Sequence, residues 1–365
     1  MFLKEVDDGI AGRNTGLITS LKKLSKFINN IQKKTYYVIG ANQKTGKTAF
    51  SDFLFILGPY VMNKNLNVKY IYFSFEIDLI EKMAKFCAFF MDYKYGIYCD
   101  SNYILSRGED KLSLEHRKLV QDIYNNELVD LFGEYDEEGN LIKEGKIIFF
   151  QDKLNPEGIR KYLLNYASNI GKFIYSKYNI NENGKSIEKQ KIAGFVEKDS
   201  KLFTFIIVDH VGLLKRERGF SKKENIDKFS EHMVFFRNVC KFSPIAISQF
   251  NRDLGKIDRL KFSGEDLQPS IEDFKDTGSL AEDASLVMAL FNPTLLPHLR
   301  KHKQYDLKKI GKGYRSLHIL ASRNTPTGVS VSLLLEGKTG NFKELPNNDE
   351  MSKLEKVYEY VQKLK

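Results

Sequence analysis

The chain has 365 residues, of which 42% are hydrophobic, so it is long enough to bury a full core as one large domain or as one domain with appendages. No apolar run approaches the roughly 20 residues that span a bilayer, and the amino terminus lacks the apolar core of a secretory signal. The formal charge of +10 favours a polyanionic partner, although the same lysine-rich and asparagine-rich usage also follows from an AT-rich genome.

Three cysteines, Cys87, Cys99 and Cys240, are far apart in the sequence and do not have the spacing of metal ligands. Their odd number and separation indicate reduced thiols in or near the core. We therefore expect a cytoplasmic protein of a bacterium or of a phage-infected host cell.

From residue 35 onward, apolar runs that predict strands alternate with segments of helical spacing. The predicted strands are Tyr36–Gly40, Lys69–Phe75, Lys146–Phe150, Phe203–Asp209, Ile245–Ser248, Leu286–Phe291, Leu317–Ser322 and Val329–Leu335. The predicted helices are Asp78–Tyr93, Ser113–Phe132, Pro156–Tyr178 and Lys223–Cys240. Because the early strands are continuously apolar, we expect an α/β fold with a mostly parallel central sheet, helices on both faces and a C-terminal β-hairpin that ends near Leu345.

Polar and charged segments divide the chain further. Residues 1–16 are a predicted short linker, residues 17–345 the main domain, and residues 346–365 an amphipathic helix that we expect to dock on its own domain, with a neighbouring chain as the alternative. Three insertions interrupt the main domain at about 133–145, 179–201 and 294–315. The first is an expected exposed hairpin or loop, the second a polar loop or small insertion, and the third a basic segment that either holds nucleic acid or is simply solvated.

A phosphate-binding loop is predicted between the first strand and the first core helix. The nine residues concerned are Ala41, Asn42, Gln43, Lys44, Thr45, Gly46, Lys47, Thr48 and Ala49. In such a loop, backbone N–H groups and the positive end of the helix surround phosphate oxygens. Lys47 is expected to reach the β- and γ-phosphates of ATP, and Thr48 to bind Mg²⁺. The usual first glycine of the motif is replaced by Ala41, although Gly40 stands just before it.

Three other strands end in polar residues that suit a nucleotide site. Asp209 follows an apolar strand and is a candidate partner of Mg²⁺, the alternative being a cap on the next turn. Glu76 follows a second strand and either polarises the attacking water or stabilises the start of the next helix. Gln249 follows a third, where its amide either senses the γ-phosphate or satisfies the strand end.

The order of these motifs resembles the RecA-like motor domain of DnaB-type replicative helicases, and Asp209-His210 is also similar to phage primase-helicases and Twinkle-type motors. The resemblance covers roughly residues 12–345 and includes Asn14–Leu17, Asp273–Ala284 and the run Ser322-Arg323-Asn324 before Gly328. It implies ATP hydrolysis with Mg²⁺, Glu76 as catalytic base, Gln249 as γ-phosphate sensor, and Arg323 as an arginine finger that acts in the neighbouring subunit's site. It also implies a homo-oligomeric ring, most simply a hexamer, that moves on single-stranded DNA, with a primase or a loader as a further partner.

Two loops are the expected DNA contacts. The first follows Asp209 and has basic residues around an aromatic one, which suits a phosphate backbone held without regard to sequence, although such runs are usually solvated loops. The second follows Gln249 and matches the family's DNA-holding position. The expected contacts are Lys215, Arg216, Arg218, Arg252, Lys275, Asp276 and Gly278.

The sequence departs from the family at two places. Ala321 stands where the family has a lysine that is also aimed at the γ-phosphate, so either hydrolysis is slower or another basic residue substitutes. Only a short linker precedes residue 12, so ring assembly is expected to be weaker or to depend on DNA or partners. The leading hypothesis is an ATP-dependent DNA helicase of replication. The alternatives are a RecA- or RadA-like recombination ATPase, and a nucleotide-gated DNA-binding scaffold with little turnover.

Overall fold

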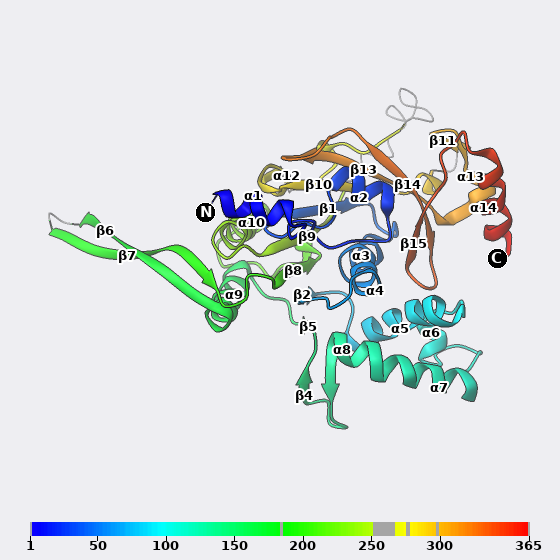
Figure 1. Cartoon of the computed structure of the whole chain (residues 1–365), viewed down its shortest axis with the longest axis horizontal. Helices are drawn as coiled ribbons and strands as arrows, with labels where there is room; N and C mark the ends of the chain where they lie inside the picture. Colours follow the sequence, from blue (N-terminus) through cyan, green and yellow to red (C-terminus); the bar gives the residue numbers. More distant parts are fainter. Residues whose placement is uncertain (1, 183–184, 251–266, 275–277, 297–298, 364–365) are drawn as a thin grey trace.

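A nine-stranded sheet lies at the centre of the computed structural model, which describes residues 2–182, 185–250, 267–274, 278–296 and 299–363 (Figure 1). Across the described part of the sheet the strand order is β15-β14-β13-β10-β1-β9-β8-β2-β5. The strands are β1 (Tyr37–Ala41), β2 (Val68–Ser74), β5 (Ile147–Phe150), β8 (Phe203–Asp209), β9 (Ser243–Gln249), β10 (Leu286–Phe291), β13 (Tyr314–Ser322), β14 (Ser330–Glu336) and β15 (Asn341–Glu344). The strands from β10 to β5 pair in parallel, whereas β13, β14 and β15 are antiparallel. The predicted mostly parallel α/β sheet with a C-terminal hairpin is confirmed.

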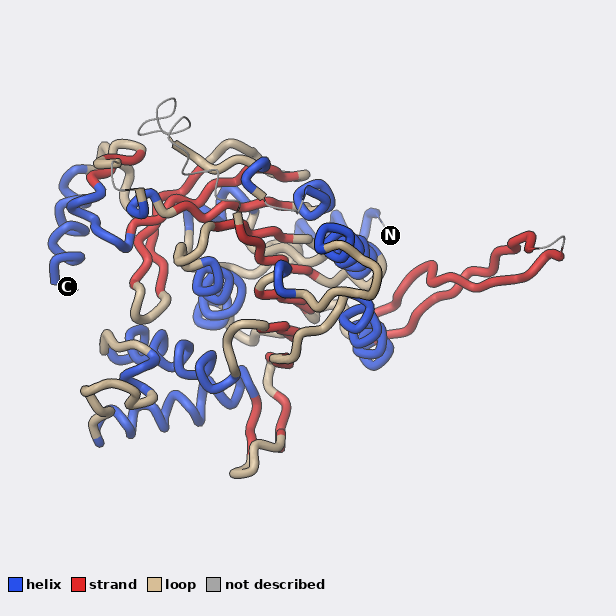
Figure 2. The backbone as a smooth tube through the Cα atoms, turned by 180° about the vertical axis from the view of Figure 1, so that it is seen from behind, coloured by secondary structure: helices blue, strands red, loops and turns tan. Residues whose placement is uncertain are grey.

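Alternate residues of the central strands point to opposite faces of the sheet, as a period of two requires. Tyr37 and Ile39 of β1 belong to one apolar core, and Tyr36 and Val38 to the other. The first core is covered by α2 (Lys22–Ile28), α3 (Lys47–Asp52), α4 (Gly58–Met62), α5 (Leu79–Tyr95), α6 (Ser101–Ile104), α7 (Leu114–Ile123) and α8 (Val129–Phe132). The second is covered by α9 (Pro156–Ile170), α10 (Lys222–Asn238) and α12 (Gly278–Asp283). Figure 2 shows helices in front of and behind the sheet.

Polar residues fix where the long helices begin. Asp78 accepts a hydrogen bond from the Glu81 backbone N–H at the start of α5, and Ser221 and Glu224 form a reciprocal capping box at the start of α10. Two π-helical turns, Phe53–Leu57 and Tyr124–Leu128, join α3 to α4 and α7 to α8. The helix after the phosphate-binding loop therefore continues through the buried π turn into α4.

The carboxyl-terminal helix α14 (Met351–Lys363) packs on its own chain, as predicted. Leu354 and Val361 are buried against an apolar cluster that includes Tyr305 and Ile310 of the 294–315 segment. The Tyr360 hydroxyl donates a hydrogen bond to Glu336 at the end of β14. The 294–315 segment consists of a short turn (Pro293–Leu295), β11 (Lys301–His302), β12 (Tyr305–Asp306) and α13 (Leu307–Ile310) before β13 begins. It is thus partly a support for α14.

Two expectations about local structure are wrong. The helix predicted over Pro156–Tyr178 ends at Ile170, and the residues that follow form β6 (Gly171–Glu182), which pairs with β7 (Lys185–Glu197) as a long hairpin. The segment predicted as a linker contains helix α1 (Phe2–Ile10). By contrast, β3 (Gly133–Tyr135) and β4 (Leu141–Glu144) form the exposed hairpin expected at 133–145. The three cysteines are buried free thiols, and no helix in the described ranges is long and apolar enough to cross a membrane.

Candidate nucleotide-binding site

The predicted phosphate-binding loop leaves β1 at Ala41 and enters α3 at Lys47. Two of its residues have left-handed backbone conformations, Lys44 with φ of 58° and Gly46 with φ of 94°. Glycine is favoured at position 46 by this conformation, and a Cβ there would also lie 2.9 Å from a terminal methyl of Leu335, which would have to move. The loop therefore curls tightly just before the helix, which directs the first free N–H groups of the helix into one concave region.

A cavity lies directly beside this loop. Its lining combines the loop and the start of α3 with the turn between β14 and β15 and with the segment at the start of α6. The residues are Lys44, Gly46, Lys47, Thr48, Ala49, Asp52, Leu57, Ile77, Lys85, Phe86, Asp100, Ser101, Asn102, Gly337, Lys338, Thr339 and Gly340. The cavity could hold the phosphates of a nucleotide at the loop and the rest of the nucleotide against residues 100–102 and 337–340. Asn42 and Gln43 belong to the loop but not to this lining.

Gly40 serves packing and does not replace the missing first glycine of the motif. A Cβ at this position would lie 2.2 Å from the Phe250 ring and 2.5 Å from the Phe274 ring. These two rings pack edge to face with centroids 5.1 Å apart, beneath the end of β1. Ala41 is fully buried as the last residue of the strand.

The sheet brings the other three candidate residues to the same edge as Lys47. Ala41 of β1 is in register with Gln249 of β9, and Ser74 of β2 is in register with Asp209 of β8. Because these strands are adjacent and parallel, their carboxyl ends form one continuous edge. Glu76 follows β2 by two residues, so Gln249, Asp209 and Glu76 follow the same end of the parallel strands as Lys47, which lines the cavity beside the loop.

The carboxylate of Asp209 fits a metal-linked role. Its side chain is almost fully buried, and its Oδ1 has no hydrogen-bond partner among the described residues. A buried charged oxygen without a partner is costly unless a cation or ordered water satisfies it. Asp209 together with Thr48 could hold Mg²⁺ with an ATP phosphate, and that ion would neutralise charge on the phosphates.

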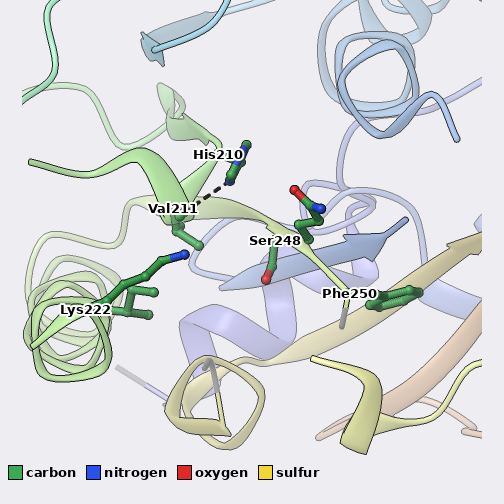
Figure 3. Close-up of a pocket in the computed structure, with 8 residues that line it drawn as sticks. His210, Val211, Lys222, Ser248 and Phe250 are labelled. Atoms are coloured by element: carbon green, nitrogen blue, oxygen red, sulfur yellow. Dashed lines mark hydrogen bonds between the residues drawn. The ribbon is translucent and has the colours of Figure 1, made fainter. Parts of the chain in front are cut away.

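His210 lies beside Glu76 at the end of β8. Its Nδ1 accepts a hydrogen bond of 3.1 Å from the Gly212 backbone N–H, which leaves the proton on Nε2, 3.6 Å from Glu76 Oε1. Burial lowers the pKa of His210, and the positive charge of Lys47 lowers it further, so the neutral ring predominates at pH 7. Figure 3 shows this ring at the edge of a small pocket that Lys222, Ser248 and Phe250 also line. At 3.6 Å the ring is a neighbour of the Glu76 carboxylate and not its hydrogen-bond partner.

The comparisons with known proteins agree with this geometry. The DnaB-like helicase C terminal domain family matches residues 163–344 of the chain. The replicative DNA helicase DnaB of Mycobacterium leprae (strain TN) is 28% identical over 123 residues, which are 33% of this chain and 18% of that helicase. The replicative DNA helicase DnaB of Buchnera aphidicola subsp. Baizongia pistaciae (strain Bp) is 26% identical over 159 residues, which are 42% of this chain and 31% of that helicase. The chain carries a DnaB-like helicase C-terminal domain. The matched part spans less than one third of either relative.

Solved structures show that this DnaB-like domain has the RecA-like ATPase fold. The ATPase domain of G40P superposes with a TM-score of 0.63 at 18% identity, covering 94% of this chain and 97% of that one. A DnaB-like replicative helicase, solved in a study of its interactions with primase, gives a TM-score of 0.62 at 17% identity, covering 93% of this chain and 66% of that one.

Arg323 of the DnaB-like domain lies at the opposite edge of the sheet from the phosphate-binding loop. Ser322 is in register with Leu286, and Leu286 is in register with Tyr37, the first residue of β1. Lys47 follows the other end of β1, after its last residue, Ala41. The guanidinium donates hydrogen bonds of 3.2 Å to the carbonyl oxygens at the end of α12, those of Glu282, Asp283 and Ala284. Arg323 therefore cannot reach the nucleotide site of its own chain.

The predicted DNA-contacting residues are only partly within the described chain. Lys215, Arg216 and Arg218 are exposed in the loop between β8 and α10. That loop is anchored by Glu217, which accepts a 2.6 Å hydrogen bond from Lys228. Gly278 is the first residue of α12, while Arg252, Lys275 and Asp276 lie outside the described residues.

A buried ionic network supports the phosphate-binding helix from behind. Lys82 of α5 is fully buried and donates hydrogen bonds of 2.8 Å to Asp52 and 2.9 Å to the Tyr72 hydroxyl. Tyr72 in turn donates to Asp52 at 2.9 Å, and burial together with Asp52 and Asp209 raises the pKa of its hydroxyl well above its usual value. The only sequence signal for this network is a lysine within an otherwise apolar helical face, which by itself does not identify a buried ion pair.

Arg315 is a second residue that sequence reasoning misjudged, because it was counted with the basic 294–315 surface. Its side chain is buried, and its Nε donates a 2.5 Å hydrogen bond to the carbonyl oxygen of Thr45 in the phosphate-binding loop. Its Nη1 donates to the carbonyl oxygens of Lys312 and Tyr314, at 2.8 and 2.7 Å. Burial lowers the pKa of Arg315 to about 10, so it stays charged at neutral pH. Arg315 thus fixes the phosphate-binding loop to the start of β13.

We expect Arg315→Ala to weaken ATP affinity. Loss of the bond to Thr45 removes a charge-assisted hydrogen bond of about 1–3 kcal/mol from the loop, which corresponds to roughly 5- to 150-fold in Kd. Equilibrium binding of a fluorescent ATP analogue measures the effect, with thermal unfolding as a check that the protein stays folded. Lys312→Ala, an exposed neighbour, is the matched control. Unchanged affinity in folded Arg315→Ala would contradict the role assigned to this bond.

Proposed function

We propose that the protein is an ATP-dependent DNA helicase that moves along single-stranded DNA as a homo-oligomeric ring, most simply a hexamer, and acts in DNA replication. The observation that carries the proposal is the separation of the two halves of the ATPase machinery in one chain. Lys47, Glu76, Asp209 and Gln249 lie at one edge of the sheet, and Arg323 lies at the other. A complete site then requires the strand end that carries Lys47 in one subunit to face Arg323 of the next. This is a head-to-tail contact, which forms a ring when its rotation closes.

Each residue at this end of the sheet has a defined task in this proposal. Lys47 binds the terminal phosphates of ATP, while Thr48 and Asp209 would hold Mg²⁺ against them. Glu76 accepts a proton from the attacking water. Gln249 reads the presence of the γ-phosphate at the end of β9. Arg323 of the adjacent subunit neutralises the negative charge that develops as the phosphoryl group is transferred.

Helix α1 supports assembly between copies of the chain. Its apolar side chains Phe2, Leu3, Val6 and Ile10 are 77%, 72%, 41% and 82% exposed, which is unusual for a helix with an apolar stripe. A neighbouring subunit would cover this stripe. Single-stranded DNA would be held by the exposed cations Lys215, Arg216 and Arg218, whose loop leaves the same sheet edge as the nucleotide site.

The test is ATP hydrolysis with and without single-stranded DNA, together with strand displacement on a forked substrate. We expect DNA to stimulate hydrolysis, and Lys47→Ala to lower the stimulated rate at least about a hundredfold. Lys64→Ala, an exposed lysine just beyond α4, is the matched control and should retain the rate. Stimulated hydrolysis without strand displacement would favour a recombination ATPase instead. Hydrolysis that stays negligible with DNA would favour a nucleotide-gated scaffold.

A further inference from the structure

The hairpin β6–β7 stands away from the body of the molecule as an extended arm (Figures 1 and 2). It leaves the body at Gly171, where a side chain would lie 2.1 Å from the Phe195 ring, so the two strands begin in close contact. At this base, Phe173 packs on Phe195, and Phe195 packs on Phe242 of the body. Glu197 accepts a 2.6 Å hydrogen bond from Lys33. The base is therefore firmly attached, and the rest of the arm extends beyond it.

The described part of the arm exposes apolar and aromatic side chains. Ile174, Tyr175, Tyr178 and Val196 are 52%, 57%, 40% and 57% exposed. A two-stranded hairpin without a third strand or a helix to pack on is only marginally stable in water. Side chains of this kind on an arm of this length indicate a surface that a partner covers.

The two faces of the arm differ in charge. Residues paired across the strands share a face, and pairs two positions apart lie on the same side. One face carries the pairs Lys172–Val196, Ile174–Gly194, Ser176–Lys191 and Tyr178–Lys189. Among these described side chains three are lysines, Lys172, Lys189 and Lys191, of which Lys189 also has an interaction within the protein. The Lys191 ammonium lies 5.6 Å from the Tyr178 ring, which agrees with their common face. On the opposite face, Lys177 is paired with Glu188 at 2.9 Å.

We propose that the lysine face of the arm binds duplex DNA. A two-stranded β-ribbon has the dimensions that the major groove of B-form DNA admits, and lysines along one face can contact the phosphates that flank the groove. Tyr178 and Ile174 lie between these lysines and can contact sugars and base edges. The lysines favour this polyanion over a second copy of the chain, because duplex DNA carries one negative charge per ~1.7 Å of its axis. The inference rests on the proposed function, in which DNA is the polymer acted on, and it adds a contact to the double-stranded part of a fork.

The test compares Lys172→Ala/Lys189→Ala/Lys191→Ala with the wild-type full chain. The probe is a blunt 30-base-pair duplex, titrated at several salt concentrations, with oligo-dT of equal length as the second ligand. We expect the triple variant to bind the duplex at least about tenfold more weakly at low salt, and the slope of log K against log salt to fall by up to about three. Affinity for oligo-dT and DNA-stimulated ATP hydrolysis should not change. Lys177→Ala, on the other face, is the matched control and should bind like the wild type.

Three other results would overturn the inference. Equal duplex affinity in the triple variant and the wild type would exclude a DNA-binding role for the lysine face. An unchanged duplex affinity with a smaller mass in light scattering would instead assign the arm to contacts between copies. An equal loss of duplex and oligo-dT affinity would show a general electrostatic effect. The proposed function fails separately: absence of DNA-stimulated hydrolysis in the wild type would overturn it even where the arm still binds duplex.

Discussion

Arg323→Ala is expected to lower the DNA-stimulated ATPase rate by about 10³- to 10⁵-fold while leaving ATP affinity nearly unchanged. Arg323 lies at the opposite end of the strands from the phosphate-binding loop of its own chain, so it can act only on a nucleotide bound by a neighbouring subunit. An arginine supplied by a neighbour contributes mainly when negative charge develops in the transition state, so ground-state binding does not need it. Steady-state hydrolysis and equilibrium nucleotide binding measure the two effects separately. Arg117→Ala, an exposed arginine on α7, serves as the control.

Mixing two inactive variants tests whether the site is shared. Lys47→Ala lacks the phosphate-binding lysine and keeps the finger, whereas Arg323→Ala keeps the lysine and lacks the finger. In a mixed assembly, some interfaces combine the intact lysine of one subunit with the intact arginine of the next, so part of the activity should return. If both variants are folded and assembled and no activity returns, the two residues do not act at one interface. Arg323→Lys tests geometry, because a lysine keeps the charge but not the planar fork.

Lys82→Met is expected to destabilise the protein by about 3–5 kcal/mol, the usual cost of leaving a buried partner charge uncompensated. Lys82 is fully buried, and Asp52 and the Tyr72 hydroxyl accept hydrogen bonds from its ammonium. Without the lysine, the Asp52 carboxylate would stay in a buried site where desolvation already raises its pKa. The free energy of unfolding from denaturant titration measures the loss.

Two further variants separate the buried charge from simple loss of packing. Asp52→Leu/Lys82→Met removes both charges and should recover much of the lost stability, because two apolar side chains can replace a buried ion pair. Lys85→Met, on the same helix, removes a partly exposed lysine that lies 3.7 Å from Glu81, and should change stability by at most about 1 kcal/mol. A double variant as unstable as Lys82→Met alone would mean that the ion pair is not the source of the effect.

The sheet, and the end of it that carries the candidate nucleotide site, could be predicted because their residues are specified locally. Continuous apolar strands such as Phe203–Asp209 end in a polar residue, and parallel strands place those ends at one edge. This argument brought Lys47, Glu76, Asp209 and Gln249 together without knowledge of the strand order. It could not find Arg315, because a buried arginine that binds a carbonyl oxygen has the same sequence signature as a surface cation.

The arm could not be predicted from spacing. Ile174, Tyr175 and Tyr178 follow α9 at intervals that suit a helix, so the helical prediction was extended past Ile170. What ends the helix is a tertiary contact, since Gly171 adopts an extended conformation that lets the Phe195 ring approach its backbone. Phe195 is distant from Gly171 in the sequence, so the residues around Gly171 do not predict that contact. The position of His210 beside Glu76 could not be predicted either, because its ring is oriented by a hydrogen bond from the Gly212 backbone N–H.

Helix α12 gives the molecule a short mechanical connection. Its first residue, Gly278, follows the second predicted DNA loop, and its last carbonyl oxygens accept hydrogen bonds from Arg323. The Ser279 hydroxyl ties it to Asp227 of α10, the helix that follows the first predicted DNA loop. A displacement of either loop would therefore be transmitted through α12 to the guanidinium of Arg323. In a ring, movement of the DNA strand past one subunit would in this way control when ATP is hydrolysed at the interface with the adjoining subunit.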